Sequence, residues 1–378
     1  MTIKSGPVVG FLKNGKMPMS NKGFHIDPAV FKTYDIRGKV PEQIDAAAAE
    51  QIARAFVAEV QPKTVIVGRD VRLTGPEFLE AVTSGLSKSG VDVINIGQVS
   101  TDEFYFACAS KKLPGIMVTA SHNPKEYNGF KMVKDMPYLV MASEFREKVT
   151  NVSYQDALKA GSAKEENLRA EFIDFVLSIV PPDKIKPPKA VIHTSNVAIG
   201  PVWEELALRL PIEIIKLCFE PDGNFPSHGN DIIQLDNQEM LRKKVKETSA
   251  DLGLIFDPDG DRCLAVDDRG VSIPGDWLTA LLAEEQLQNH PGATILYDIR
   301  ASDAVPDMVK AAGGVPFVWK PGHVYIKSEM QKRGIVFGGE VSGHFYFKDF
   351  FYADSGLLAG LTMLQYVSGL ATPLSDKI

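Results

Sequence analysis

The chain has 378 residues, enough for two or three domains, and its 44% hydrophobic and 24% charged residues are typical of a globular protein. A formal net charge of −7 argues against a general nucleic-acid binder, and three widely spaced cysteines argue against a disulfide-stabilised secreted fold. The sequence opens without a convincing signal peptide, and no apolar run is long enough to cross a bilayer, so we expect a cytoplasmic protein.

The predicted elements follow a repeated plan after an unpatterned start. Residues 1–23 are rich in Gly, Pro, Lys and Asn, which predicts a flexible extension. Three later segments each contain a predicted strand, loop, helix and strand, and they begin at residues 64, 190 and 293. This order predicts three similar α/β domains in series, which we place at residues 24–150, 151–250 and 251–370.

One serine follows a predicted buried strand in the first domain. The short apolar run Gly115–Val118 predicts that strand, and Asn123 and Pro124 favour a turn in the loop after it. Between them is Ser121, at the end of a strand, where α/β proteins usually place their chemistry. A serine hydroxyl is a weak nucleophile alone and needs a nearby base or an electrophile held by a cation. We therefore interpret Ser121 as the carrier of a phosphoryl group.

A second loop carries three carboxylates at alternate positions. Asp257, Asp259 and Asp261 follow a predicted strand, and Arg262 comes directly after them. Converging carboxylates repel one another unless a hard divalent cation such as Mg²⁺ lies between them. An EF-hand is one alternative, but Arg262 occupies the place of its turn glycine and predicted strands flank the loop. A solvated acidic turn is another, although an arginine beside three aspartates indicates a charged ligand.

Two further loops carry groups that suit a phosphorylated sugar. Glu340 and Ser342 alternate in a glycine-rich loop, so in an extended chain both would face one side and bind neighbouring sugar hydroxyls. The alternative is a glycine-rich turn with a capping glutamate. Lys320 and His323 lie on a loop after a predicted strand, where they can hold a phosphate, although a solvated turn shows the same pattern.

These loops resemble those of the α-D-phosphohexomutases, and most closely the bacterial phosphomannomutase/phosphoglucomutase group. The resemblance extends from about Phe31 to Leu370. The matching segments are Tyr34-Asp35-Ile36-Arg37-Gly38, Gly68-Arg69-Asp70, Thr119-Ala120-Ser121-His122-Asn123-Pro124, Tyr127-Asn128-Gly129-Phe130-Lys131, Asp257-Pro258-Asp259-Gly260-Asp261-Arg262, Lys320-Pro321-Gly322-His323 and Gly339-Glu340-Val341-Ser342-Gly343-His344. The family implies α/β domains, each with a mixed sheet between helices, around a central cleft. It also implies a fourth, phosphate-binding domain, which we expect to be missing here, with residues 371–378 as the start of a linker to it.

The resemblance implies a mutase that interconverts hexose 6-phosphate and hexose 1-phosphate, with mannose or glucose as the sugar. Ser121 would be phosphorylated, and it would bind Mg²⁺ together with Asp257, Asp259 and Asp261. A hexose 1,6-bisphosphate would be both the intermediate and the activator. The other implied catalytic residues are His122, Lys131, Arg37 and Arg262, and the implied substrate-binding residues are Arg37, Lys131, Arg262, Lys320, His323, Glu340 and Ser342.

Several alternatives stay open from the sequence. His122 also fits a hydrogen-bonded structural histidine, and Lys131 also fits a solvated surface lysine. The competing functions are a phosphoglucosamine mutase, a serine phosphatase, and a non-catalytic protein that binds sugar phosphate and Mg²⁺. The expected partners are small-molecule sugar phosphates, with no nucleic acid and no membrane, and we expect a monomer or a homodimer.

Overall fold

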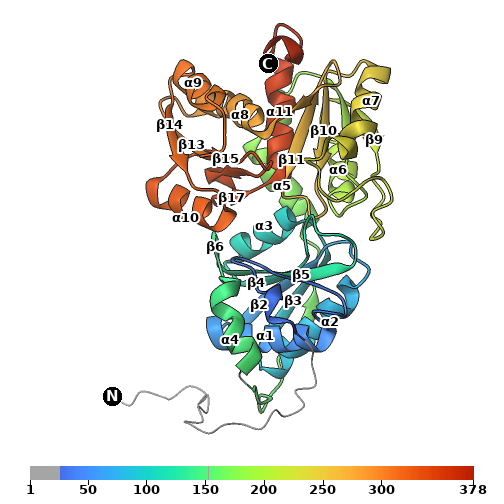
Figure 1. Ribbon diagram of the computed structural model, residues 1–378, viewed down its shortest axis with the longest axis vertical. Coiled ribbons are helices and arrows are strands. Elements are labelled where there is room, and N and C mark those ends of the chain that lie inside the picture. Colours follow the sequence, from blue (N-terminus) through green and yellow to red (C-terminus); the bar gives the residue numbers. More distant parts are fainter. Residues whose placement is uncertain (1–25, 152) are drawn as a thin grey trace.

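Three α/β units follow one another along the chain. The computed structural model describes residues 26–151 and 153–378, so the extension expected over residues 1–23 lies outside the described part of the chain. Figure 1 shows the first unit as one lobe at the bottom, with the second and third units side by side above it. Each unit contains a mixed sheet with helices packed against it, as the sequence predicts.

The first unit contains a seven-stranded sheet in the order β1-β5-β4-β2-β3-β7, with β6 paired to β5. Its strands are β1 (Ile36–Lys39), β2 (Thr64–Arg69), β3 (Asp92–Gln98), β4 (Gly115–Val118), β5 (Tyr127–Asp135), β6 (Tyr138–Leu139) and β7 (Ala163–Glu165). Its helices are α1 (Ala46–Val60), α2 (Gly75–Lys88), α3 (Thr101–Lys111) and α4 (Ala142–Asn151). The limit expected at residue 150 falls too early, because β7 returns to pair with β3 before the chain enters the second unit.

The second unit contains a five-stranded sheet in the order β12-β11-β10-β8-β9. Its strands are β8 (Lys189–His193), β9 (Glu213–Leu217), β10 (Leu252–Phe256), β11 (Cys263–Asp267) and β12 (Ser272–Ile273), and its helices are α5 (Arg169–Ile179), α6 (Gly200–Leu206) and α7 (Glu239–Thr248). We expected a new unit to begin at residue 251. Instead, residues 257–262, which we call the metal loop, join β10 to β11 within the second sheet. The reason is that α7 is a crossover helix, which returns the chain so that β10 pairs in parallel with β8.

The third unit contains a five-stranded sheet in the order β14-β13-β15-β16-β17. Its strands are β13 (Thr294–Asp298), β14 (Val315–Trp319), β15 (Phe337–Gly339), β16 (Phe345–Phe347) and β17 (Ala353–Asp354), and its helices are α8 (Gly275–Asn289), α9 (Ala304–Ala311), α10 (His323–Arg333) and α11 (Gly356–Gly369). The segment after α11 packs against the second unit, because Leu374 is buried and Ser375 donates hydrogen bonds to Asp268. No described helix is both long and apolar enough to cross a membrane.

The three sheets share one strand order, and this order places three loops at equivalent positions. Each sheet has three parallel strands followed by an antiparallel strand: β3-β2-β4 then β5, β9-β8-β10 then β11, and β14-β13-β15 then β16. The loop that enters the antiparallel strand contains Ser121 in the first sheet, the three aspartates in the second and Glu340 in the third. Equivalent loops of the three repeated units therefore carry different functional groups: a serine hydroxyl in the first, three carboxylates in the second and a glutamate in the third.

Apolar packing fixes these loops relative to one another. One hydrophobic core includes Phe104 and Tyr105 of α3, the strands of the second sheet and much of the third unit. A second core packs α1 and α2 against the first sheet. Helix α11 lies between the second sheet and the rest of the third unit, as Figure 1 shows in red. Because α3 of the first unit is part of the larger core, the three units pack as one body around their loops.

A buried histidine ends the strand β8. His193 is fully buried, and its Nδ1 accepts a hydrogen bond from the Ser195 amide at 3.1 Å. Its ring lies 4.9 Å from the ring of His228, and within the part of the chain that the structure describes Nε2 has no hydrogen-bond partner. Burial, followed by the charge of a protonated His228, lowers the pKa of His193 to about 3. His193 is therefore a neutral imidazole at pH 7.

We expect this imidazole to make the fold sensitive to acid. A histidine in the unfolded chain binds a proton near pH 6.5, whereas folded His193 resists protonation until about pH 3. Its stabilising contribution is therefore present above pH 6.5 and is lost as the pH falls towards 3, by up to about 1.4 kcal/mol per pH unit. His193→Asn keeps an acceptor for Ser195 but cannot titrate. Urea unfolding between pH 4 and pH 7 should show a shallower loss of unfolding free energy in this variant than in wild type, whereas an equal loss would contradict the prediction.

Candidate active site

Ser121 lies in the loop between β4 and β5 and is almost fully buried. Its backbone has a φ of 46°, a left-handed conformation that is uncommon for residues other than glycine. Thr119 stabilises this turn, because its Oγ1 accepts a hydrogen bond from the Ser121 amide at 2.9 Å and donates to Asp70 Oδ2 at 2.7 Å. The Ser121 hydroxyl lies 3.3 Å from Asp257 Oδ2, so the serine loop meets the metal loop directly, as the phosphoserine hypothesis requires.

A buried arginine that we did not predict in the site holds the serine loop in this shape. Arg72 follows β2, and its side chain is fully buried. Its guanidinium donates to four backbone carbonyl oxygens, those of Ser121 at 2.5 Å, Asn123 at 2.7 Å, Pro124 at 2.7 Å and Tyr127 at 2.8 Å. Its Nε lies 3.2 Å from Asp70 Oδ2, which supplies the compensating charge. One planar guanidinium therefore donates hydrogen bonds to four carbonyl oxygens of the serine loop and the strand that follows it.

The metal loop joins β10 to β11, and all three of its aspartates are buried. One carboxylate oxygen from each of the three lies within 4.8 Å of the other two, and strands on both sides exclude an EF-hand. Lys131 of β5 contacts two of them, with its Nζ 2.6 Å from Asp259 Oδ2 and in direct contact with Asp261 Oδ2. The Oδ1 atoms of Asp259 and Asp261 are buried and have no hydrogen-bond partner among the described residues. Two such oxygens beside a serine hydroxyl fit a divalent cation, because buried acceptors without partners are costly.

Burial and the surrounding charges shift the pKa values of the three aspartates in opposite directions. The pKa of Asp257 is raised well above its usual value, first by burial and then by repulsion from Asp261 and Asp259. Burial also opposes ionisation of Asp259 and Asp261, but Lys131, together with Arg37 for Asp259 and with Arg262 for Asp261, outweighs it and the pKa of both is lowered. The same carboxylates raise the pKa of Lys131 well above its usual value, against the effect of burial. Lys131 is therefore a fixed buried cation and not a solvated surface lysine.

His122 and Arg262 connect the serine loop with the metal loop. Arg262 Nη2 lies 2.7 Å from His122 Nδ1, which itself lies 3.3 Å from Ser121 Oγ. Burial, followed by the positive charges of Arg262 and Arg37, lowers the pKa of His122 to about 4, so the imidazole is neutral at pH 7. Arg37 of β1 donates to Asn123 Oδ1 at 3.1 Å, so it too contacts the serine loop. A neutral imidazole beside the serine hydroxyl is able to accept a proton.

The sugar loop between β15 and β16 forms a turn, and our expectation of an extended chain is wrong. The Gly343 amide donates to the Glu340 carbonyl at 3.1 Å, and Gly343 has a φ of 87°, which glycine adopts without strain. Glu340 is buried, and its carboxylate accepts from the Gly322 amide at 2.9 Å and the Tyr346 hydroxyl at 2.5 Å. Arg300, which we did not predict, lies 3.6 Å from the same carboxylate. Glu340 is thus fixed by contacts from three segments of the third unit.

His344 links the sugar loop to the metal loop, although we did not include it among the predicted site residues. Its Nδ1 lies 3.0 Å from Ser342 Oγ and 3.5 Å from Glu340 Oε2. Its Nε2 lies 3.2 Å from Arg262 Nε and 3.7 Å from Asp261 Oδ1. Burial, followed by Arg262, lowers its pKa well below the usual value, so His344 is a second neutral imidazole. Through His344, the sugar loop reaches the site that contains Ser121.

The remaining predicted residues lie around Asp35 and the start of α10. Arg37 pairs with Asp35 at 2.7 Å, and His323 Nε2 lies 3.9 Å from the other oxygen of the same carboxylate. Burial, followed by Lys327, lowers the pKa of His323 to about 4. Lys320 is exposed, and its Nζ lies 3.4 Å from the centre of the Tyr325 ring. Arg37 and His323 therefore share a carboxylate with one another, whereas Lys320 packs on an aromatic ring at the surface.

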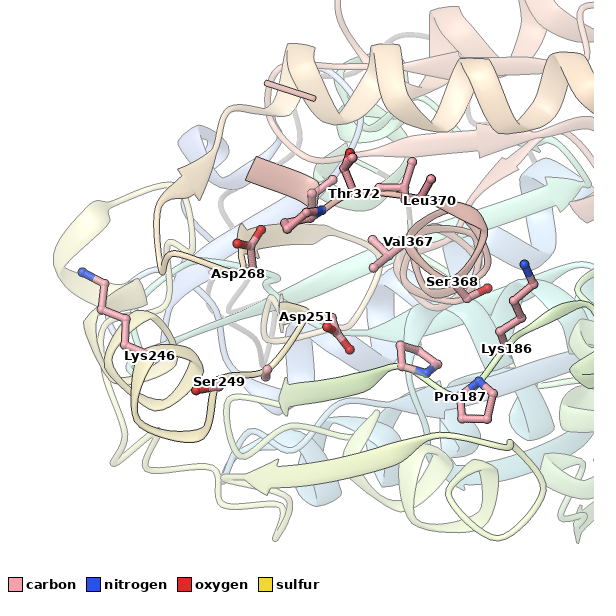
Figure 2. Close-up of a pocket in the computed structure, with 15 residues that line it drawn as sticks. Lys186, Pro187, Lys246, Ser249, Asp251, Asp268, Val367, Ser368, Leu370 and Thr372 are labelled. Atoms are coloured by element: carbon pink, nitrogen blue, oxygen red, sulfur yellow. The ribbon is translucent and has the colours of Figure 1, made fainter. Parts of the chain in front are cut away.

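A hollow of about 670 Å³ lies at the opposite end of the second sheet from the metal loop. Its lining includes Pro188 and Asp251, which precede β8 and β10, whereas the metal loop follows β10. Figure 2 shows Lys186 and Lys246 at opposite ends of this hollow. Its lining contains none of the buried side-chain polar atoms that lack a partner in the described chain. The hollow therefore lacks the chemistry found around Ser121.

The fold and the site together define a class of protein. Phosphoryl transfer depends on alignment and on neutralisation of charge, and this site brings a buried serine, three aspartates and several cations to one point. Family models for the phosphoglucomutase/phosphomannomutase α/β/α domains match the chain, with domain I over residues 28–153, domain II over 170–270 and domain III over 274–378. The chain belongs to the phosphoglucomutase/phosphomannomutase family.

Individual relatives agree with the family models. A phosphomannomutase of Escherichia coli K12 is 39% identical over 349 residues, which are 89% of this chain and 76% of the relative. A Xanthomonas campestris pv. campestris protein with the name "Phosphohexose mutases" is 37% identical over 353 residues, which are 92% of this chain and 79% of the relative. The crystal structure of a phosphoglucomutase/phosphomannomutase family protein from Burkholderia thailandensis has 34% identity and a TM-score of 0.86, and covers 93% of this chain and 79% of that one. The chain is thus a phosphotransferase of the mutase class.

Proposed function

We propose that this protein interconverts hexose 6-phosphate and hexose 1-phosphate through a phosphorylated Ser121, with mannose or glucose as the sugar. The observation that carries the proposal is the buried Ser121 hydroxyl, which lies 3.3 Å from both Asp257 Oδ2 and His122 Nδ1. Relatives named phosphomannomutase support mannose, and the family description adds glucose. A hexose 1,6-bisphosphate is the proposed intermediate and activator.

Each transfer breaks one bond to phosphorus and forms another. A free hydroxyl of the sugar phosphate attacks the phosphoryl group on Ser121, the bond between phosphorus and Ser121 Oγ breaks, and a sugar bisphosphate results. His122 would accept the proton of the attacking hydroxyl at Nδ1, once Arg262 leaves that atom to contact the phosphoryl group, and would return the proton to Ser121 Oγ. Lys131 and Arg262 neutralise charge on the transferring group. The bisphosphate then turns around, and its other phosphate returns to Ser121 by the reverse step.

The metal and the sugar each have a proposed set of residues. Asp257, Asp259 and Asp261, with an oxygen of the phosphorylated Ser121, would hold Mg²⁺, which would withdraw charge from the phosphoryl oxygens. The remaining substrate-binding residues divide by their place in the site. Glu340 and Ser342 would bind sugar hydroxyls, Lys320 and His323 would hold the phosphate that is not being transferred, and Arg37, which contacts the serine loop, would contact the phosphoryl group on Ser121.

A coupled assay tests the proposal directly. Mannose 1-phosphate, glucose 1-phosphate and glucosamine 1-phosphate are each supplied with Mg²⁺ and a trace of the matching 1,6-bisphosphate, and the 6-phosphate product is measured. We expect turnover with the mannose or glucose compound, and its loss when the metal is chelated. Preference for the glucosamine compound would favour a phosphoglucosamine mutase. Release of inorganic phosphate without isomer formation would indicate a phosphatase, and binding without turnover would indicate a non-catalytic protein.

Replacing one metal-loop aspartate should separate activity from stability. In Asp259→Asn the proposed metal site loses a charged ligand, so we expect turnover at saturating Mg²⁺ to fall by at least about 100-fold. The Asp259 carboxylate stabilises the folded protein, because Lys131 pairs with it and its pKa is lowered, so the metal-free variant should stay folded in buffer but unfold at a lower urea concentration than the metal-free wild type. The mutase assay and urea unfolding in a chelator measure the two effects. Unchanged turnover would refute the metal assignment.

A further inference from the structure

The first turn of α3 contacts the metal loop from the first unit. The Thr101 amide donates to the Asp259 carbonyl at 2.8 Å, and Thr101 Oγ1 donates to Asp259 Oδ2 at 2.9 Å. Thr101 is fully buried, and it is the first residue of a helix that Ser100 and Glu103 cap reciprocally. Thr101 of the first unit therefore donates hydrogen bonds to both the backbone carbonyl and the side-chain carboxylate of Asp259 in the second unit.

The next residue of α3 fixes the same helix end against the third unit. Asp102 Oδ2 accepts hydrogen bonds from Ser355 Oγ at 2.6 Å and from the Leu357 amide at 3.0 Å, at the start of α11. Figure 1 shows α3 where the three units meet. Because its first turn is bonded to the second unit through Thr101 and to the third through Asp102, Thr101 has little freedom to move away from Asp259.

The two carboxylate oxygens of Asp259 differ in their hydrogen bonding. Oδ2 accepts from Thr101 at 2.9 Å and from Lys131 at 2.6 Å, whereas Oδ1 is buried and has no partner in residues 26–151 and 153–378. The Thr119 hydroxyl lies 3.5 Å from Oδ2 but is only 2.7 Å from Asp70, so it contributes little to Asp259. Two donors on one oxygen prevent the carboxylate from rotating and leave the other oxygen free.

We propose that Thr101 is a positioning residue of the metal site, whose hydroxyl orients the Asp259 carboxylate so that Oδ1 faces a bound divalent cation. The inference rests on the metal site of the proposed function and adds a residue from another unit to it. Groups that hold a metal ligand in place commonly change metal affinity or activity by about 10- to 100-fold when they are removed. Thr101 itself touches neither the cation nor the substrate.

Metal affinity of this 378-residue chain, measured with Ser121 phosphorylated and unphosphorylated, tests the inference without using activity. Isothermal titration calorimetry with Mg²⁺ and with Mn²⁺ compares wild type, Thr101→Val and Thr101→Ser. Valine keeps the shape of threonine and the backbone bond to Asp259 but removes the hydroxyl, so we expect about 10-fold weaker binding of both ions. Serine keeps the hydroxyl and should bind within about threefold of wild type. Thr83→Val, which removes the Thr83 hydroxyl bond to Leu79 O within α2, is the matched control and should bind as wild type does.

The outcomes distinguish failure of this inference from failure of the metal site. If wild type binds no divalent cation in either the phosphorylated or the unphosphorylated form, the metal site is wrong. If wild type binds and Asp259→Asn does not, but Thr101→Val binds as wild type does, the positioning role of Thr101 is wrong. Urea unfolding in a chelator checks that Thr101→Val is folded. Should it unfold, Thr101→Ala replaces it, and wild-type affinity in that variant equally overturns the inference.

Discussion

Ser121→Ala is expected to abolish both phosphate incorporation and mutase turnover while the protein stays folded. The proposed phosphoryl group is carried on Ser121 Oγ, so no other atom of the site can replace it, and we expect turnover to fall by at least about 1,000-fold. Alanine removes a hydroxyl whose contacts are long, at 3.3 Å to Asp257 and 3.3 Å to His122, so little stability should be lost. Intact-mass spectrometry and the coupled assay measure the two losses.

A second serine variant shows whether the lost phosphate belongs to Ser121. Ser178 is exposed on α5, and its hydroxyl bonds only locally to the Phe175 carbonyl at 2.6 Å. Ser178→Ala should therefore keep both the phosphate and the turnover of wild type. If Ser121→Ala still gained one phosphate when incubated with a hexose 1,6-bisphosphate, the covalent intermediate would lie elsewhere and the proposed reaction path would have to be abandoned.

The repeated unit was predictable because its signals are local. Short apolar runs, turn residues and helical segments near residues 64, 190 and 293 correspond to β2, α2 and β3, to β8, α6 and β9, and to β13, α9 and β14. Each loop motif also lies within a few residues, so Ser121 and the three aspartates were identifiable as chemical groups. The shared strand order then explains why separate motifs converge, since equivalent loops of three similar sheets meet at one point.

What the sequence could not show are contacts between distant segments. The domain limit at 251 was wrong because nothing in the run 252–256 says that it pairs with β8, about 60 residues earlier. Arg72 looked like one more loop residue, because its four carbonyl partners lie 49 to 55 residues away. The Asp259 partner Thr101 lies 158 residues away. Pairings of this kind are set by packing of the whole fold, so residue spacing alone does not reveal them.

Arg72→Met is expected to cost about 3–5 kcal/mol of unfolding free energy, the usual penalty for removing one partner of a buried ion pair. Methionine fills much of the volume of arginine but leaves Asp70 buried without its countercharge. It also leaves the carbonyls of the serine loop without their shared donor. Burial raises the pKa of Asp70 although Arg72 opposes the shift, so the carboxylate depends on this partner. Because the same donor shapes the turn at Ser121, phosphate incorporation should also fall.

A double-mutant cycle identifies the source of this loss. If the unpaired Asp70 charge dominates, Asp70→Asn combined with Arg72→Met should be more stable than Arg72→Met alone, and the two changes should not add. Arg209→Met, which removes an exposed ion pair with Asp174 at 2.7 Å, applies the same substitution at the surface and should cost less than about 1 kcal/mol. Urea unfolding of wild type, the three variants of the cycle and Arg209→Met measures these differences. Equal losses in Arg72→Met and Arg209→Met would mean that the buried guanidinium does not support the serine loop, and the left-handed turn at Ser121 would then need another source of stability.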